Sequence, residues 1–205
     1  YGATITAPSA PTRDGYTFTG WDKDIPESMP AEDMTITAQW TANEYSITYE
    51  LDGGTNHEDN PTTYTIETET ITLNDATKTG YSFEGWHDKA EEGTKVTEIP
   101  QGSTGDIILY AYWTAKQYTV TFDAQNGTES ETQQVTYDAA YGTLPTPTKT
   151  GHEFRGWFTQ ADGGIEVNAE TIVETANDHT LYAQWTVNQY TITFDSAGGS
   201  AVAEI

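Results

Sequence analysis

Apolar and hydroxyl-bearing residues alternate in three separate stretches of this chain. The clearest is Tyr118–Asp123, in which threonines precede Val120 and Phe122. A period of two residues is typical of a strand that buries one face. The same alternation recurs at Tyr45–Tyr49 and at Tyr190–Phe194. We therefore predict a strand at each of these three stretches.

A glycine-containing turn follows each alternating stretch. The turns are Asp52-Gly53-Gly54, Asn126-Gly127 and Ala197-Gly198-Gly199. Glycine and asparagine tolerate the positive φ angles of tight hairpin turns, so each stretch is expected to open a hairpin. The returning strands are expected near Thr63–Ile66 and Gln133–Tyr137.

A second recurring segment ends in Gly-Trp and also fits a strand. Its three copies occupy residues 11–21, 76–86 and 147–157, and we call it the Gly-Trp segment. Glycine beside the tryptophan permits a bulge or a close backbone approach. A last strand, clearest at Leu181–Trp185, ends each copy on another tryptophan. The pattern therefore predicts four or five strands in each copy.

Only one stretch suggests a helix. Ala139–Gly142 fits a single helical turn, closed by Pro145 and Pro147. Such a turn is too short to be stable alone. The predicted fold class is therefore α+β but strongly β-rich, with at most one short helix in each copy.

The recurrences divide the chain into copies of one module of about 70 residues. Tyr45 lies 73 residues before Tyr118, which lies 72 residues before Tyr190. We name the copies the first to fourth repeats. They are an incomplete repeat at 1–41 that lacks its opening hairpin, complete repeats at 45–114 and 118–186, and the opening hairpin of a further repeat at 190–205.

The connections between repeats are short and constant. The last tryptophan of a repeat lies five positions before the next opening tyrosine, with no glycine or proline between them. Constant, short linkers predict a semi-regular string rather than freely jointed modules.

Taken together, these motifs resemble the Listeria–Bacteroides repeat, the B-repeat of internalin-type bacterial surface proteins. The resemblance rests on the opening Tyr-x-Ile/Val-x-Phe/Tyr strand, the Gly-Trp segment and the Leu-Tyr-Ala-Gln-Trp ending at Leu181–Trp185. It implies a compact, β-grasp-like module that occurs in tandem on secreted or wall-anchored proteins. The family brings no catalytic residues. Departures are His152 in place of the usual aromatic residue and Ala76 in place of proline.

Composition narrows the possible partners. Eight basic and 32 acidic residues give a formal net charge of −24. Such a surface repels nucleic acids and anionic membranes, so neither is expected as a partner. The chain has no cysteine, so large aromatic residues must stabilise these small modules in place of disulfides. No apolar run approaches the roughly 20 residues of a membrane span.

The aromatic residues are the first candidates for a binding site. All six tryptophans lie in predicted strands beside glycine, alanine or other strand residues, and we predict that they are structural anchors rather than a sugar-binding platform. They are Trp21, Trp40, Trp86, Trp113, Trp157 and Trp185. We predict instead that the outward-facing tyrosines Tyr110, Tyr112 and Tyr182 make any binding contacts, although cross-strand packing also accounts for them.

A basic residue recurs within the Gly-Trp segment. Arg13, Lys78 and Lys149 occupy the same position in three repeats, in a chain with only eight basic residues. This recurrence predicts one local partner, a carboxylate or a carbonyl of the same repeat.

Metal and catalytic motifs are missing from the sequence. The histidines at 57, 87, 152 and 179 occupy four different places in the repeat, and no pair has metal-ligand spacing. Acidic pairs such as Glu91-Glu92 lie in variable loops without a calcium-binding pattern. No nucleophile elbow or phosphate loop is present. We predict no enzyme activity, no cofactor and no metal.

The leading functional hypothesis is a stalk or spacer segment in adhesion by an extracellular or cell-surface bacterial protein. One alternative is that the repeats themselves bind a host protein, matrix protein or glycan. Another is a non-catalytic appendage of a secreted glycan-degrading enzyme. The partial repeats at 1–41 and 190–205 are complementary, so head-to-tail self-association through them is also expected.

Overall fold

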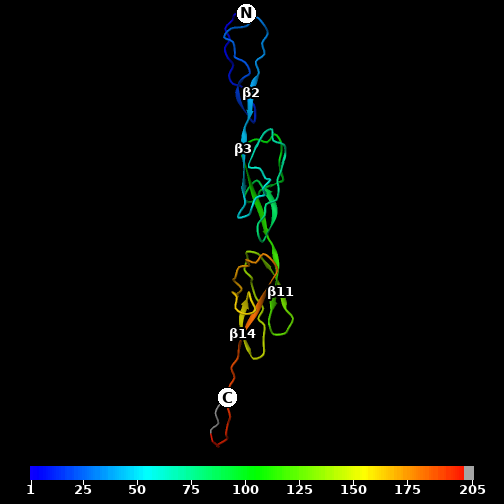
Figure 1. The fold of residues 1–205 in the computed structure, drawn as a ribbon, viewed down its shortest axis with the longest axis vertical. Coiled ribbons are helices and arrows are strands. Elements are labelled where there is room, and N and C mark those ends of the chain that lie inside the picture. The colour runs from blue at the N-terminus through cyan, green and yellow to red at the C-terminus, as the bar shows by residue number, and fades with distance from the viewer. Residues whose placement is uncertain (201–205) are drawn as a thin grey trace. The chain divides into compact units, whose positions relative to one another are not determined.

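The computed structural model describes residues 1–200, and every regular element in this range is a strand. The strands of the first repeat are β1 (Tyr16–Trp21) and β2 (Ala38–Ala42) (Figure 1). The strands of the second repeat are β3 (Glu44–Glu50), β4 (Thr63–Thr65), β5 (Ile71–Thr72), β6 (Tyr81–His87), β7 (Lys95–Val96), β8 (Glu98–Ile99) and β9 (Ile107–Ala115). The strands of the third repeat are β10 (Gln117–Asp123), β11 (Glu131–Thr136), β12 (His152–Phe158), β13 (Glu166–Val167) and β14 (His179–Val187).

The strands belong to two compact units. The first unit holds Tyr1–Lys78 and Ser82–Thr114, and the second holds Thr79–Tyr81 and the chain from Ala115 onward. The first unit contains a two-stranded sheet β1-β2, a five-stranded sheet in the order β4-β3-β9-β6-β7 and a small pair β5-β8. The second unit contains a five-stranded sheet in the order β11-β10-β14-β12-β13.

The two five-stranded sheets share one topology. The opening strand lies between its hairpin partner and the last strand, antiparallel to the first and parallel to the second. In the third repeat Phe122 lies opposite Leu181, and in the second repeat Tyr49 lies opposite Leu109. These pairings confirm the predicted opening and returning strands of both repeats, and they bring the beginning and end of each repeat together.

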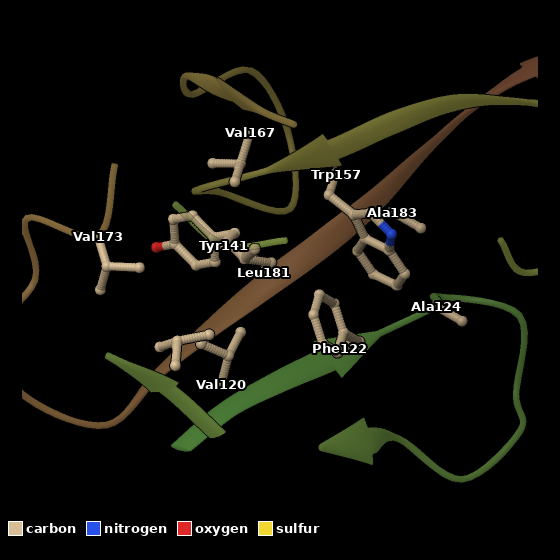
Figure 2. Close-up of a cluster of buried hydrophobic side chains, with 10 residues drawn as sticks. Val120, Phe122, Ala124, Tyr141, Trp157, Val167, Val173, Leu181 and Ala183 are labelled. Atoms are coloured by element: carbon tan, nitrogen blue, oxygen red, sulfur yellow. The ribbon is translucent and has the colours of Figure 1, made fainter. Parts of the chain in front are cut away.

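The alternating residues of the opening strands form the core of each sheet. In the third repeat Val120 and Phe122 are buried together with Trp157 and Leu181 (Figure 2). In the second repeat Ile47 is buried with Trp86 and Leu109. Because only alternate residues of a strand point to one face, the threonines between them lie outside this core.

Tandem, strongly β-rich modules are confirmed, but the helical turn predicted at Ala139–Gly142 is wrong. The residue before it, Asp138, has a φ of 62°, outside the helical region. Tyr141 then donates its backbone N–H to the carbonyl of Thr171, and Ala140 forms a bridge with Ile172. These bonds to a distant segment replace the local ones that a helical turn requires.

A strand at Tyr190–Phe194 is also not formed. Tyr190, Ile192 and Phe194 are 75%, 58% and 45% exposed, and no residue among the first 200 pairs with their backbone. A strand requires such a partner. The turn at Ala197–Gly199 is present, since Ala197 and Gly198 have φ angles of 49° and 95°. Residues 201–205 of the expected hairpin lie outside the described residues.

The glycine of the Gly-Trp segment has a conformation that other residues avoid. Gly20, Gly85 and Gly156 have φ angles of 133°, 129° and 146°. The pairing register shifts at Gly20 and at Gly156, as expected for a β-bulge. The positive φ, which all three glycines share, explains why glycine precedes the tryptophan in each copy.

Candidate functional site

The tryptophans of the two complete repeats are engaged in packing and hydrogen bonds. Trp86 and Trp157 are 2% exposed, and their indole N–H groups donate to the carbonyls of Asn74 and Pro145 at 2.9 and 2.8 Å. Trp113 and Trp185 are half-buried and donate to the carbonyls of Leu51 and Ala124. All four therefore use their only donor within their own repeat.

The first repeat places its tryptophans differently. Trp21 and Trp40 are half-buried and pack edge-on against Phe18, with ring centroids 5.3 and 5.5 Å away. Trp21 lines an apolar groove of about 410 Å³, together with Met29 and Met34. In the complete repeats, an aromatic residue of the opening strand contacts the corresponding tryptophan, with Phe122 lying 4.9 Å from Trp157. Residues 1–41 contain no counterpart of that strand.

The three candidate tyrosines have different surroundings. The Tyr112 hydroxyl donates to the carbonyl of Lys89 and accepts the N–H of Gly93, and its ring stacks on His87 at 3.7 Å. Tyr112 therefore holds the loop between β6 and β7. Tyr110 and Tyr182 occupy the same position in their repeats and are half-buried. Their hydroxyls form no hydrogen bond with residues 1–200, so they retain polar groups for a ligand.

Other tyrosines belong to the interior. Burial raises the pKa of Tyr49 to about 12, and its hydroxyl donates to the carbonyl of Pro61 at 2.9 Å. Burial also raises the pKa values of Tyr64 and Tyr141. Tyr64 and Tyr141 are core residues and Tyr49 packs against a core with its hydroxyl already bonded, so these tyrosines are poor candidates for ligand contacts.

The recurring basic position has a local partner in both complete repeats. The Lys78 ammonium forms an ion pair with Asp52 at 3.1 Å. The Lys149 ammonium donates to the backbone carbonyl of Gln125 at 2.9 Å. The prediction of a carboxylate or carbonyl partner is confirmed for these two lysines. It is wrong for Arg13 in the kind of partner, since the Arg13 guanidinium lies over the aromatic ring of Tyr16, in the same repeat, at 3.6 Å.

A polar cleft of about 290 Å³ lies beside Lys149 in the third repeat. Ala183, Trp185 and Val187 of the last strand, β14, contribute to its wall. Its polar and aromatic lining consists of Gln125, Lys149, His152, Arg155, Asp162, Gln184 and Trp185.

Residues 1–200 contain no group of three or more histidine, cysteine, aspartate or glutamate side chains that could hold a metal ion. The four histidines lie in different settings, as the sequence indicates. His87 donates a hydrogen bond from Nδ1 to the carbonyl of Gly93, while His179 bonds to the hydroxyl of Tyr141 at 2.7 Å.

Two aspartates that the sequence patterns did not single out join the beginning and end of the two complete repeats. Asp106 accepts the backbone N–H of Ser46 at 2.8 Å, and Asp178 accepts that of Thr119 at 2.7 Å. Both precede the last strand and cap the opening strand beside it. Each lies three residues before the buried leucine of the last strand, so this recurrence was a detectable signal.

Asp106→Asn is expected to weaken the second repeat more at pH 7 than at pH 3. The hydrogen bond from Ser46 lowers the pKa of Asp106. The carboxylate therefore stabilises the fold above its ordinary pKa of about 3.9, and this contribution is lost as the pH falls through the lower folded value. Urea unfolding midpoints of both proteins at the two pH values measure the effect. The exposed Glu98→Gln is the control, and an equal Asp106→Asn effect at both pH values would contradict the prediction.

No helix in the described part of the chain has the length and apolar character needed to cross a membrane. The profile of the Listeria-Bacteroides repeat domain matches residues 1–39, 45–112 and 118–184. These segments cover most of the chain and coincide closely with the first three repeats.

Named relatives are bacterial and longer than this chain. A putative Gly-rich membrane protein of Evansella cellulosilytica is 31% identical over 217 residues, covering 100% of this chain and 24% of the relative. A putative membrane protein of the same organism is 31% identical over 205 residues, covering 95% and 30%. Internalin H of Listeria monocytogenes is 40% identical over 116 residues, covering 55% and 20%. The chain therefore spans less than a third of each relative.

Proposed function

This chain belongs to the Listeria-Bacteroides repeat domain family, and from that premise we propose that it is a non-catalytic spacer in adhesion at a bacterial surface. Its work is to hold another part of the same protein away from the cell. The named relatives, two membrane proteins and an internalin, support a surface location.

One recurring backbone hydrogen bond carries the spacer proposal. The linker residue after each last strand donates its N–H to the first glycine of the Gly-Trp segment, always at 2.9 Å. The pairs are Asn43 with Gly15, Lys116 with Gly80, and Asn188 with Gly151. This bond fixes the linker residue to its own repeat in the same way each time, which supports the spacer proposal. The net charge of −24 adds mutual repulsion between neighbouring chains.

The spacer role predicts that deletion of residues 1–205 reduces antibody access to the part of the protein that the repeats hold away from the cell. An epitope tag placed on the far side of the repeats should be accessible to antibody on intact cells, and it should lose that access when the repeats are deleted. A flexible Gly/Ser linker of equal length is the control, and it should restore access only in part because it coils. Equal antibody binding in all three strains would contradict the spacer role.

A binding role is the second candidate, favoured by the free hydroxyls of Tyr110 and Tyr182. Under this hypothesis the chain shows saturable binding on a protein or glycan array, and the double change Tyr110→Ala with Tyr182→Ala abolishes it. If the chain is instead a non-catalytic appendage of a glycan-degrading enzyme, the array should show saturable binding to a glycan that this enzyme degrades.

We propose further that each five-stranded sheet is a β-grasp arrangement in which coil replaces the helix. The strand order supports this, since the opening strand lies beside and parallel to the last strand.

A further inference from the structure

The polar cleft of the third repeat gathers positive charge in a strongly acidic protein. Lys149, Arg155 and His152 line it, with Asp162 as its one acidic residue. Only eight lysines and arginines occur in the whole chain, against 32 acidic residues. Solubility is already provided by the acidic surface, so it does not explain this local concentration of basic groups.

The cleft of the third repeat is more positive than the same region of the second repeat because two residues differ. Gln125 replaces the residue at Asp52, and Arg155 replaces the residue at Glu84, while the lysine is kept. Of these three positions, the second repeat thus has two negative and one positive charge. The third repeat has two positive charges and none negative.

The lysine has lost its ionic partner as a result. Lys78 is neutralised by Asp52 at 3.1 Å, whereas Lys149 has no carboxylate partner among residues 1–200 and donates to the neutral carbonyl of Gln125 at 2.9 Å. Lys149 is half-buried and lies 5.8 Å above the Trp185 ring. A partly desolvated ammonium without a carboxylate partner favours the arrival of an anion.

Arg155 is also free to bind an anion. Its side chain is exposed, and its guanidinium lies 5.7 Å from the centre of the Phe158 ring. The ion pairs within residues 1–200 are Lys78–Asp52 and His57–Asp59, so Arg155 is paired with no carboxylate. A guanidinium binds a carboxylate through two parallel hydrogen bonds, which makes it selective for that group.

We propose that this cleft binds one acidic sugar residue, a uronate, through its carboxylate. Arg155 and Lys149 bind the carboxylate, and Asp162 accepts hydrogen bonds from the sugar hydroxyls. Trp185 still anchors its strand, and only the part of its half-buried ring that lines the cleft lies against the sugar ring. The volume of about 290 Å³ is at the lower end of small-molecule sites, which suits one sugar ring rather than a longer segment.

The two glutamines of the cleft hold its walls in place through hydrogen bonds. The Gln125 amide donates to the carbonyls of Ala161 and Ala183, and the Gln184 amide donates to those of Gln160 and Gly163. These bonds fix the loop after β12 that carries Asp162. The binding groups therefore lie on a supported surface, which lowers the entropy cost of ordering them.

The proposal is tested by titrating the full chain with glucuronate while recording amide chemical shifts. Saturable, millimolar binding with shifts centred on Lys149, Arg155 and Trp185 is expected, with glucose and acetate each binding more weakly. Arg155→Glu should weaken glucuronate binding at least about tenfold, because it removes a charge-assisted pair and adds repulsion. The second repeat already has glutamate at this position, so the fold tolerates the change.

Glu84→Gln is the matched control, and it should leave glucuronate binding unchanged. Absence of saturation, or equal binding by Arg155→Glu, would overturn the proposal. Acetate binding as tightly as glucuronate would overturn the assignment to a sugar. The spacer role does not depend on this cleft, so failure here leaves the antibody-access result unaffected.

Discussion

Trp157→Ala is expected to destabilise the third repeat by about 3–5 kcal/mol, the usual cost of removing a buried large aromatic side chain. Trp157 is 2% exposed and packs against Phe122 (Figure 2), with the ring centroids 4.9 Å apart. Its ring centroid also lies 5.7 Å from that of Phe154. A module of about 70 residues without disulfides has only a few kcal/mol of stability in total. The substitution should therefore leave the third repeat largely unfolded at room temperature.

Urea unfolding followed by circular dichroism measures the loss, and amide hydrogen exchange at Val120 and Leu181 locates it in the third repeat. Trp157→Phe keeps an aromatic ring but leaves the carbonyl of Pro145 without its donor, so a smaller loss is expected. Ile165→Ala is the control, since Ile165 is 73% exposed in the same repeat. A change below about 1 kcal/mol for Trp157→Ala would show that this tryptophan is not an anchor.

Gly156→Ala is expected to cost about 1–3 kcal/mol through backbone strain. Gly156 has a φ of 146°, which L-residues rarely adopt, and it forms the bulge that places Trp157 in the core. An added Cβ would also lie 3.0 Å from the carboxylate of Glu166, but that flexible side chain can move away. Strain is therefore the larger effect, and urea unfolding measures it.

Two further variants separate strain from crowding. Gly20→Ala places a Cβ with no neighbour within 4 Å at a φ of 133°, so it should destabilise the first repeat by strain alone. Adding Glu166→Ala to Gly156→Ala should restore little stability. Full rescue by the second change would assign the cost to crowding and contradict the strain argument.

Individual strands could be predicted because the residues that specify each one are neighbours in the sequence. Alternating residues such as Val120 and Phe122 specify a strand and its buried face, whichever neighbouring strand it pairs with. The basic position at Lys78 and Lys149 indicated a partner in its own repeat, because its recurrence is visible in a single sequence. The helical turn at Ala139–Gly142 failed for the opposite reason, since its backbone bonds go to Ala169, Thr171 and Val173.

The candidate site could likewise be predicted only in part from the sequence. Tyr112 fits an exposed position by its place in the strand, yet its hydroxyl is used by Lys89 and Gly93, which only the loop geometry brings near it. The charge difference between Arg155 and Glu84 is present in the sequence. That Arg155 shares a cleft with Lys149 and Trp185 depends on the pairing of β12 with β14.

By itself, the sequence determined the repeat, its strands, its family and the absence of disulfides, since composition and short periods record these directly. Only the tertiary structure decided which strand ends meet, and therefore that Asp106 caps Ser46 from 60 residues away. It also decided which tryptophans are buried and which cationic groups share a cleft. The physical reason is that burial and hydrogen bonding depend on sheet order and register, and many orders are compatible with the same alternating strands.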